Sequence, residues 1–270
     1  MARRRKSGSS TTSKVVISAV VLVVIGLFSF LFLNQSPKID QVTGCPFDNS
    51  LSKRTIVLLF DTTSKLTATQ EKKIRDITYQ VVEKSNTFDR VRIYEVDPAS
   101  EKLLKAEFDF CKPAKEDSLG NNVRQKFAKI NFERRFDKIF QEADYKRPTS
   151  PIIEALGSIA ASFPLNGSRK HLIIASDFIE NSEILNQFQS SWRSSSENNK
   201  LLEDRRPSLE GIKVSMLFIP RASIDHHNKS FSDWWKDYLK SSGARLVDQE
   251  FIDSETGQSY VLYPFIPITG

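Results

Sequence analysis

Aspartates follow two apolar runs of this sequence, at the places where strands of a sheet would end. Asp61 comes directly after residues 55–60, and Asp177 comes after residues 171–175 and one serine. Ligands of open α/β sheets bind outside the carboxyl ends of the strands, so chemistry is expected at these positions. Asp61 and Thr63 carry the oxygens that a hard cation such as Mg²⁺ prefers. The two interpretations are a cation site and a set of polar side chains that cap loops and helices.

The segments around these positions have the spacing of a fold that would bring them together. Strand-like apolar runs alternate with segments whose apolar residues have helical spacing. This alternation predicts the α/β class, with a Rossmann-like, mostly parallel sheet flanked by helices. Strands are expected at 55–60, 91–96, 104–110, 171–175 and 214–219, with an edge strand at 245–248 and a β-ribbon within 250–265. Helices are expected after a capping box at Thr67 and Gln70, at 121–143, from Pro151, at 182–192 and from Ser230, with a loop or frayed helix end at 193–208.

At the strand ends the chain resembles the von Willebrand factor A-type (vWA) domain. Residues 61–65, DTTSK, fall on the D-x-S-x-S element of that family's metal-ion-dependent adhesion site. Residues 150–156, SPIIEAL, fall on its T-P-x-x-E-A-L segment, and residues 174–178, IASDF, fall on its L-x-T-D-G segment. The resemblance covers residues 53–245 and implies a vWA fold. It also implies a degenerate site for Mg²⁺ or Mn²⁺ with the ligands Asp61, Thr63, Ser150 and Asp177.

The chain departs from the family motif at Lys65 and Phe178. Lys65 stands where a hydroxyl ligand is expected, and Phe178 stands where the family has glycine. An ammonium group at position 65 would repel a divalent ion, or would itself lie between Asp61 and Asp177 in place of the metal. Residues 61–67, DTTSKLT, also resemble a DTTDPLT variant of the family found in membrane-anchored bacterial proteins. The metal site, the lysine substitute and an inactive inherited site remain open alternatives.

Residues 15–33 form a run of 19 residues without a charge. A helix of that length is about 28 Å long, close to the hydrocarbon thickness of a bilayer, which predicts one N-terminal transmembrane helix. A buried core helix, a cleaved signal peptide and a lipoprotein cleavage box at 42–45 are the alternatives. The run lacks the polar face of a core helix, and no small-residue cleavage site follows it directly.

Basic residues lie on the N-terminal side of this run. Five precede it, and residues 34–48 contain only Lys38. The positive-inside rule then keeps the N-terminus in the cytoplasm and predicts a bacterial inner-membrane protein with a periplasmic or extracellular C-terminal domain. The expected order is a cytoplasmic basic tail over 1–14, a transmembrane helix over 15–33, a linker over 34–52, and a vWA-like domain with a C-terminal β-ribbon over 53–270.

Cys45 and Cys111 are the two cysteines of the chain. In an oxidising compartment two lone cysteines most simply pair, and the alternative is two buried thiols. A bridge would close a loop of about 65 residues. Residues 110–113, FCKP, resemble a Cys-Asn-Pro segment of the membrane-anchored variant, which supports the pairing.

The net charge of +6 overstates the basic character of the expected domain. Residues 1–33 hold five basic residues and no acid, which leaves 34 basic and 33 acidic residues in the rest. A nearly neutral body gives no case for nucleic-acid binding. Of the weaker candidates, the Asp-His-His sequence at 225–227 is interpreted as a solvated loop, and His171 as a structural histidine. One of Trp234 and Trp235 should lie in the core, and the other should lie there too or contact a partner or membrane.

These observations predict a membrane-anchored, extracytoplasmic binding or scaffold domain that is not an enzyme. It would bind another protein through its strand-end surface, contact the lipid bilayer through residues 15–33 and bind no nucleic acid. The alternative is a metal-dependent hydrolase that uses Asp61 and Asp177 at the strand ends.

Overall fold

The computed structural model describes residues 10–33, 38–40, 42–63, 65–96, 106–112, 149–163, 169–189, 196–219, 229–252 and 259–261, with single residues between 130 and 141. The chain separates into two units, Met1–Lys38 and Ile39–Gly270. The first unit holds α1 (Ser10–Leu33), whose large apolar side chains from Val15 to Phe28 are exposed. No helix in the described part of the chain has both the length and the apolar character needed to cross a bilayer.

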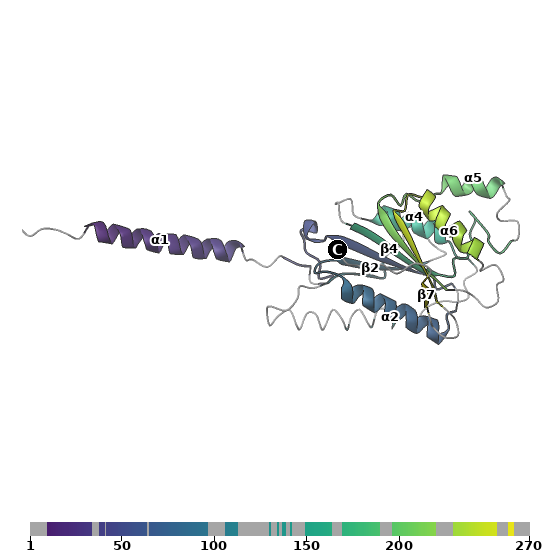
Figure 1. Ribbon diagram of the computed structural model, residues 1–270, viewed down its shortest axis with the longest axis horizontal. Helices are drawn as coiled ribbons and strands as arrows, with labels where there is room; N and C mark the ends of the chain where they lie inside the picture. Colours follow the sequence, from purple (N-terminus) through teal and green to yellow (C-terminus); the bar gives the residue numbers. More distant parts are fainter. Residues whose placement is uncertain are drawn as a thin grey trace, which may run out of the picture. The chain divides into compact units, whose positions relative to one another are not determined.

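The second unit contains a sheet whose described strands follow the order β3-β2-β1-β4-β5-β6-β7 (Figure 1). The five inner strands run parallel, and β3 and β7 pair antiparallel at the two edges. From β3 to β6 the order is that of doubly wound α/β folds. The predicted α/β class with a mostly parallel sheet is confirmed. The strands are β1 (Arg54–Phe60), β2 (Arg90–Glu95), β3 (Phe108–Cys111), β4 (Arg169–Ser176), β5 (Ile212–Phe218), β6 (Leu246–Ile252) and β7 (Ser259–Val261).

Helices cover both faces of the sheet, with α2 on one side and α4 and α6 on the other (Figure 1). Successive side chains of a strand point to opposite faces. In β1, Val57 and Leu59 therefore join the core under α4 and α6, whereas Ile56 and Leu58 join the core over α2. Burial on both faces explains why these strands are continuous apolar runs in the sequence. The described helices of this unit are η1 (Asn49–Leu51), α2 (Ala68–Lys84), α4 (Ile152–Ser162), α5 (Ser196–Asp204) and α6 (Lys229–Ser241).

Helix α2 begins where the capping box predicts. Thr67 Oγ1 accepts a hydrogen bond from the Gln70 amide at 3.2 Å, and Gln70 Oε1 accepts one from the Thr67 amide at 3.0 Å. These bonds satisfy two donors that the first turn of a helix leaves unpaired. Helix α4 likewise begins directly after Pro151, as the sequence indicates.

The helix predicted at 182–192 is wrong for the residues of that segment that the structure describes. They form turns and short bridges. Ser182 and Asn186 each accept, through the side chain, a hydrogen bond from the amide two residues ahead, at 3.1 and 3.0 Å. These side chains thus take the backbone donors that a helix would need. A helix, α5, lies instead within 193–208, where a loop or a frayed helix end was expected.

Strand β6 is longer than the edge strand predicted at 245–248, and it lies between β5 and β7 rather than at the edge. The antiparallel pairing of residues 250–252 with residues 259–261 confirms this part of the predicted ribbon. Strand β3 begins at Phe108, and residues 104–105 of the strand predicted there lie outside the described residues. Of the helix predicted at 121–143, the described residues are helical and the others lie outside the description.

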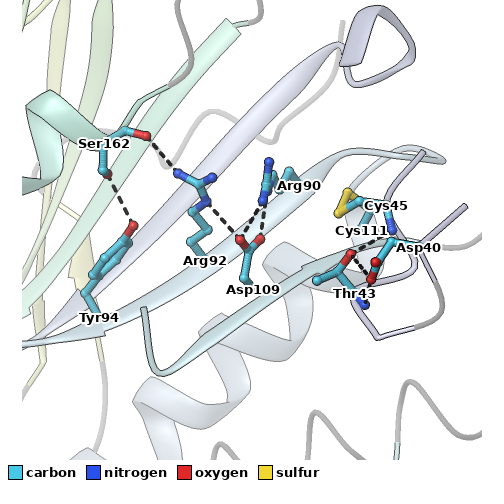
Figure 2. Close-up of polar contacts among 9 residues, drawn as sticks. All are labelled: Asp40, Thr43, Cys45, Arg90, Arg92, Tyr94, Asp109, Cys111 and Ser162. Atoms are coloured by element: carbon cyan, nitrogen blue, oxygen red, sulfur yellow. Dashed lines mark hydrogen bonds and ion pairs between the residues drawn. A yellow bond between two sulfur atoms is a disulfide. The ribbon is translucent and has the colours of Figure 1, made fainter. Parts of the chain in front are cut away.

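A disulfide joins Cys45 and Cys111, as predicted (Figure 2). It ties the segment before β1 to the end of β3, across a sequence separation of 66. Asp40 Oδ1 accepts hydrogen bonds from the Thr43 amide at 2.7 Å and the Thr43 hydroxyl at 2.9 Å. The Thr43 carbonyl in turn accepts one from the Cys111 amide at 2.9 Å. Residues 39–52, which the sequence assigns to a linker, therefore lie in the second unit.

Buried polar groups lie at the amino-terminal end of the sheet. Arg54 Nε lies 3.2 Å from Asp89 Oδ2, and the two side chains are 6% and 0% exposed. His171, in β4, is also buried, with Nε2 2.8 Å from Ser215 Oγ. Burial, followed by the charges of Lys213 and Arg54, lowers the pKa of His171 to about 3. His171 is therefore the neutral structural histidine that its apolar surroundings in the sequence indicate.

Candidate functional site

Asp61 is the centre of a hydroxyl cluster at the carboxyl ends of β1 and β4. Its Oδ1 accepts hydrogen bonds from the Thr63 amide at 3.0 Å and the Thr63 hydroxyl at 2.5 Å. Its Oδ2 accepts from Ser150 Oγ at 3.1 Å and from Ser176 Oγ at 2.7 Å. Asp61 is 4% exposed, so the four donors replace the water that the carboxylate has lost.

Three separate segments position these donors. The Asp61 amide donates to the Ala175 carbonyl at 2.9 Å, which continues the β1–β4 ladder to the site. Ser150 precedes α4 and exchanges two backbone hydrogen bonds with Asn181, at 2.9 and 3.1 Å. Ser176 ends β4, and its hydroxyl also accepts from the Phe178 amide at 2.7 Å. The site therefore depends on the loop after β4 as well as on β1.

The Asp177 side chain bonds to its own loop. Its Oδ1 accepts a hydrogen bond from the Ile179 amide at 2.9 Å. It is 3% exposed. The next residue, Phe178, has φ of +59°, a left-handed conformation that favours glycine. This chain thus holds a bulky residue in a conformation that glycine adopts most readily. Packing holds it: the Phe178 ring stacks on Phe218, and Trp235 Nε1 donates to the Phe178 carbonyl at 2.7 Å.

Lys65 does not join this cluster. Its side chain is exposed, and within the described residues it forms no ion pair with Asp61 or Asp177. The hydroxyls of Thr63, Ser150 and Ser176 compensate Asp61 instead. A role for Lys65 as a substitute for the metal stays a prediction.

The residues present fit a hard cation. The Asp61 and Asp177 carboxylates and the hydroxyls of Thr63, Ser150 and Ser176 are all oxygen donors, the class that Mg²⁺ and Mn²⁺ take. A hydroxyl group that donates a hydrogen bond to Asp61 keeps the lone pairs of its oxygen, so this oxygen can still coordinate a cation. The described residues contain no group of three or more histidine, cysteine, aspartate or glutamate residues, so such a cation would depend on hydroxyls and water.

Sequence reasoning placed Asp61, Thr63, Ser150 and Asp177 in one site. The structure brings the first three together by hydrogen bonds, whereas Asp177 Oδ1 accepts from the amide of Ile179 in its own loop. Sequence reasoning did not name Ser176 as a member, although this serine occupies the threonine position of the third motif segment. The sequence at 225–227 lies outside the described residues. Trp235 is fully buried and Trp234 is partly buried with its ring stacked on Tyr238, so both belong to the helix packing of α6.

No family model and no curated protein matches this chain. Similar solved structures include the VWA domain of SpRpn10, at 6% identity over 75% of this chain and 90% of that one, with a TM-score of 0.37. A von Willebrand factor type A protein from Catenulispora acidiphila is 11% identical over 75% of this chain and 39% of its own, with a TM-score of 0.37. BatB from Bacteroides thetaiotaomicron is 15% identical over 73% of this chain and 89% of its own, with a TM-score of 0.38.

The α/β fold and the assembled motif residues agree with the vWA-like domain that the sequence predicts. The mostly parallel sheet and the meeting of motif residues around Asp61 are what the motifs predict. Identities and scores as low as those of the solved structures say nothing about function, which has to be argued from the site.

Proposed function

We propose that this chain is a membrane-anchored vWA-like domain that binds another protein through the strand-end surface around Asp61, outside the cytoplasmic membrane. The observation that carries the proposal is the assembled cluster of Asp61 with three hydroxyl groups from three segments. Binding sites of α/β sheets usually lie at the topological switch point, outside the carboxyl ends of the strands, and this preformed polar cluster lies there.

A hydrolase at the same place is less well supported. A metal-dependent hydrolase would use Asp61 or Asp177 to activate water. Both oxygens of Asp61 instead accept hydrogen bonds from hydroxyl groups, and Asp177 Oδ1 accepts one from the Ile179 amide. This arrangement holds the two carboxylates as structural acceptors and favours binding over catalysis.

The membrane part of the proposal is supported by the first unit. The uncharged run 15–33 lies within α1, whose large apolar side chains from Val15 to Phe28 are exposed. The basic residues before this run favour a cytoplasmic N-terminus. The disulfide supports an oxidising location for the second unit, because disulfides persist there and are rare in the cytosol.

A photo-crosslinking residue placed at Lys65 tests this function in intact bacterial cells. Lys65 is exposed beside the cluster, so we expect it to capture a partner protein. The matched control is the same residue at Lys53, which is exposed at the opposite, amino-terminal end of β1 and should capture none. Protease added outside spheroplasts should degrade the captured product. Equal capture at both positions, or a product protected from protease, would contradict the proposal.

A titration with Mg²⁺ or Mn²⁺ tests whether the cluster takes a cation. Lys65→Ser removes a positive charge and adds a hydroxyl. We therefore expect millimolar Mg²⁺ to raise the Tm of this variant by several degrees through ligand linkage. The same Mg²⁺ concentration should raise the Tm of the wild type by less. Lys65→Ala is the control, and in chelator it should change the free energy of unfolding by no more than about 0.5 kcal/mol, because the residue is exposed. A marked loss of stability in that variant would instead mean that Lys65 stands in for the metal.

A further inference from the structure

Two glutamates, Glu180 fully buried and Glu154 partly buried, lie where the loop after β4 meets the start of α4. Glu180 is fully buried, and its Oε2 accepts a hydrogen bond from the Ile153 amide in the first turn of α4, at 2.9 Å. Its own amide donates to Gln187 Oε1 at 2.9 Å, which closes the loop. Glu154 follows Ile153 in the same turn of α4, and its Oε2, like Oε1 of Glu180, is buried without a hydrogen-bond partner. Two carboxyl groups can hydrogen-bond to each other only when one of them holds a proton.

Buried polar atoms without a hydrogen-bond partner collect around this pair. Within the part of the chain that the structure describes they are Glu154 Oε2, Glu180 Oε1, Gln187 Nε2 and Tyr238 Oη. Buried polar groups are normally hydrogen-bonded, so a group of unpaired ones calls for an explanation. A carboxyl pair that changes its protonation provides one, because its hydrogen-bond requirements differ between the two states.

The titratable and charged groups around the pair come from α6 and from the segment after α5. Tyr238 lies on α6, and after α5 follow Arg205, whose charge acts on Glu154, and Arg206, whose charge acts on Tyr238. Burial, followed by the charge of Glu154, raises the pKa of Glu180 well above its ordinary value of 4.5. Burial also raises the pKa of Glu154, which its hydrogen bonds and the charge of Arg205 oppose. The pKa of the Tyr238 phenol is raised as well, chiefly by burial and then by Glu180, so it stays protonated beside the pair.

We propose that Glu154 and Glu180 share one proton, and that this proton holds the loop after β4 against α4 and so makes the strand-end surface sensitive to pH. The proposal rests on the function proposed above, because it assigns a regulation to that same surface. With the proton in place, one carboxyl group donates to the other across the junction. Loss of the proton to water leaves two neighbouring carboxylates, and like charges away from bulk water repel.

The loop that would respond also borders the Asp61 cluster. Asn181, next to Glu180, exchanges two backbone hydrogen bonds with Ser150, which donates to Asp61. On the other side of the loop, Trp235 donates to the Phe178 carbonyl. Movement of Glu180 away from Glu154 would therefore displace neighbours on both sides, and the Trp235 indole would report it.

The direction of the pH effect follows from the raised pKa values. At pH values above 4.5 the folded chain binds a proton that the unfolded chain has released, so stability falls as the pH rises through the pKa of the folded pair. Glu180→Gln keeps the size of the side chain, cannot ionise and can donate to Glu154. The variant should therefore have the same Tm as the wild type near pH 4.5. At mildly alkaline pH its Tm should exceed that of the wild type by at least about 2–4 °C.

The test follows the Trp235 indole N–H signal of the full chain by NMR over this pH range, with Trp192→Phe and Trp234→Phe to assign it. In the wild type the signal should shift with pH, and in Glu180→Gln it should not. Glu183→Gln is the matched control, because Glu183 is exposed on the same loop and should behave as the wild type.

A wild-type signal that stays fixed, or a control that matches Glu180→Gln, would overturn the proposal. If Glu180→Gln does not fold, Glu154→Gln provides the same arrangement from the α4 side, an amide that can donate to one carboxylate, and the wild-type titration remains decisive alone. None of these measurements needs a partner. They therefore stand if crosslinking at Lys65 fails, and crosslinking can succeed where the proton switch fails.

Discussion

Asparagine in place of Asp89 is expected to lower the free energy of unfolding by about 3–5 kcal/mol. Asp89 is fully buried, and its Oδ2 accepts from the Asn86 amide at 2.7 Å while it pairs with Arg54. Burial lowers the pKa of the Arg54 guanidinium and the charge of Asp89 opposes this, so the carboxylate keeps the cation charged. The amide would leave a buried positive charge without its counter-ion. Chemical denaturation of the two proteins measures the difference.

A second ion pair of the same sheet provides the control. Asp109 binds Arg90 through two hydrogen bonds, at 2.7 and 2.6 Å, but its side chain is 26% exposed (Figure 2). Water can replace part of what the carboxylate provides, so Asp109→Asn should cost about 1 kcal/mol or less. The combined change Arg54→Met and Asp89→Leu should recover much of the loss, since an apolar replacement leaves no charge unpaired. Equal costs for Asp89→Asn and Asp109→Asn would show that burial does not set the strength of these pairs.

Removal of the disulfide by Cys45→Ser with Cys111→Ser should cost about 4 kcal/mol. The bridge closes a loop across a sequence separation of 66, and the chain-entropy account assigns a loop of this size a value between those of 15 and 100 residues. The folded state should survive, because β3 keeps its ladder with β2 and the Cys111 amide keeps its bond to Thr43. Denaturation with and without a reductant measures the same quantity in the wild type. Two thiols that react freely with an alkylating agent in the native protein would contradict the bridge.

The strands were predictable because burial on both faces leaves its mark on the sequence itself. Residues 55–60 and 171–175 are continuous apolar runs, and the structure extends each by only one to three residues. The capping box at Thr67 was equally predictable, since all of its partners lie within one turn. The segment from Ser182 failed because the apolar spacing of a helix is present while two polar side chains bind the local backbone instead.

Only those residues of the candidate site that lie in recognisable motif segments were predictable from the sequence. Asp61, Thr63 and Ser150 stand in recognisable segments, and the fold brings them together. The pair of Glu154 and Glu180 was not found, because glutamates in a sequence give no sign of burial. Their contact arises only when the loop after β4 packs on α4. In the same way, the inner position of β6 depends on a partner strand that its own residues do not specify.

The bond between Cys45 and Cys111 also decides how this domain would carry tension. A pull on the chain at Ile39 reaches Cys45 before it reaches β1, and part of the load passes through a covalent bond into the end of β3. From there it spreads along the ladder into β2 rather than entering the central strand alone. In reducing conditions no covalent bond would divert the load before Arg54, the first residue of β1, and only weaker contacts such as the Thr43–Cys111 hydrogen bond would remain. The oxidised domain should thus withstand a larger stretching force at its N-terminal tether than the reduced one.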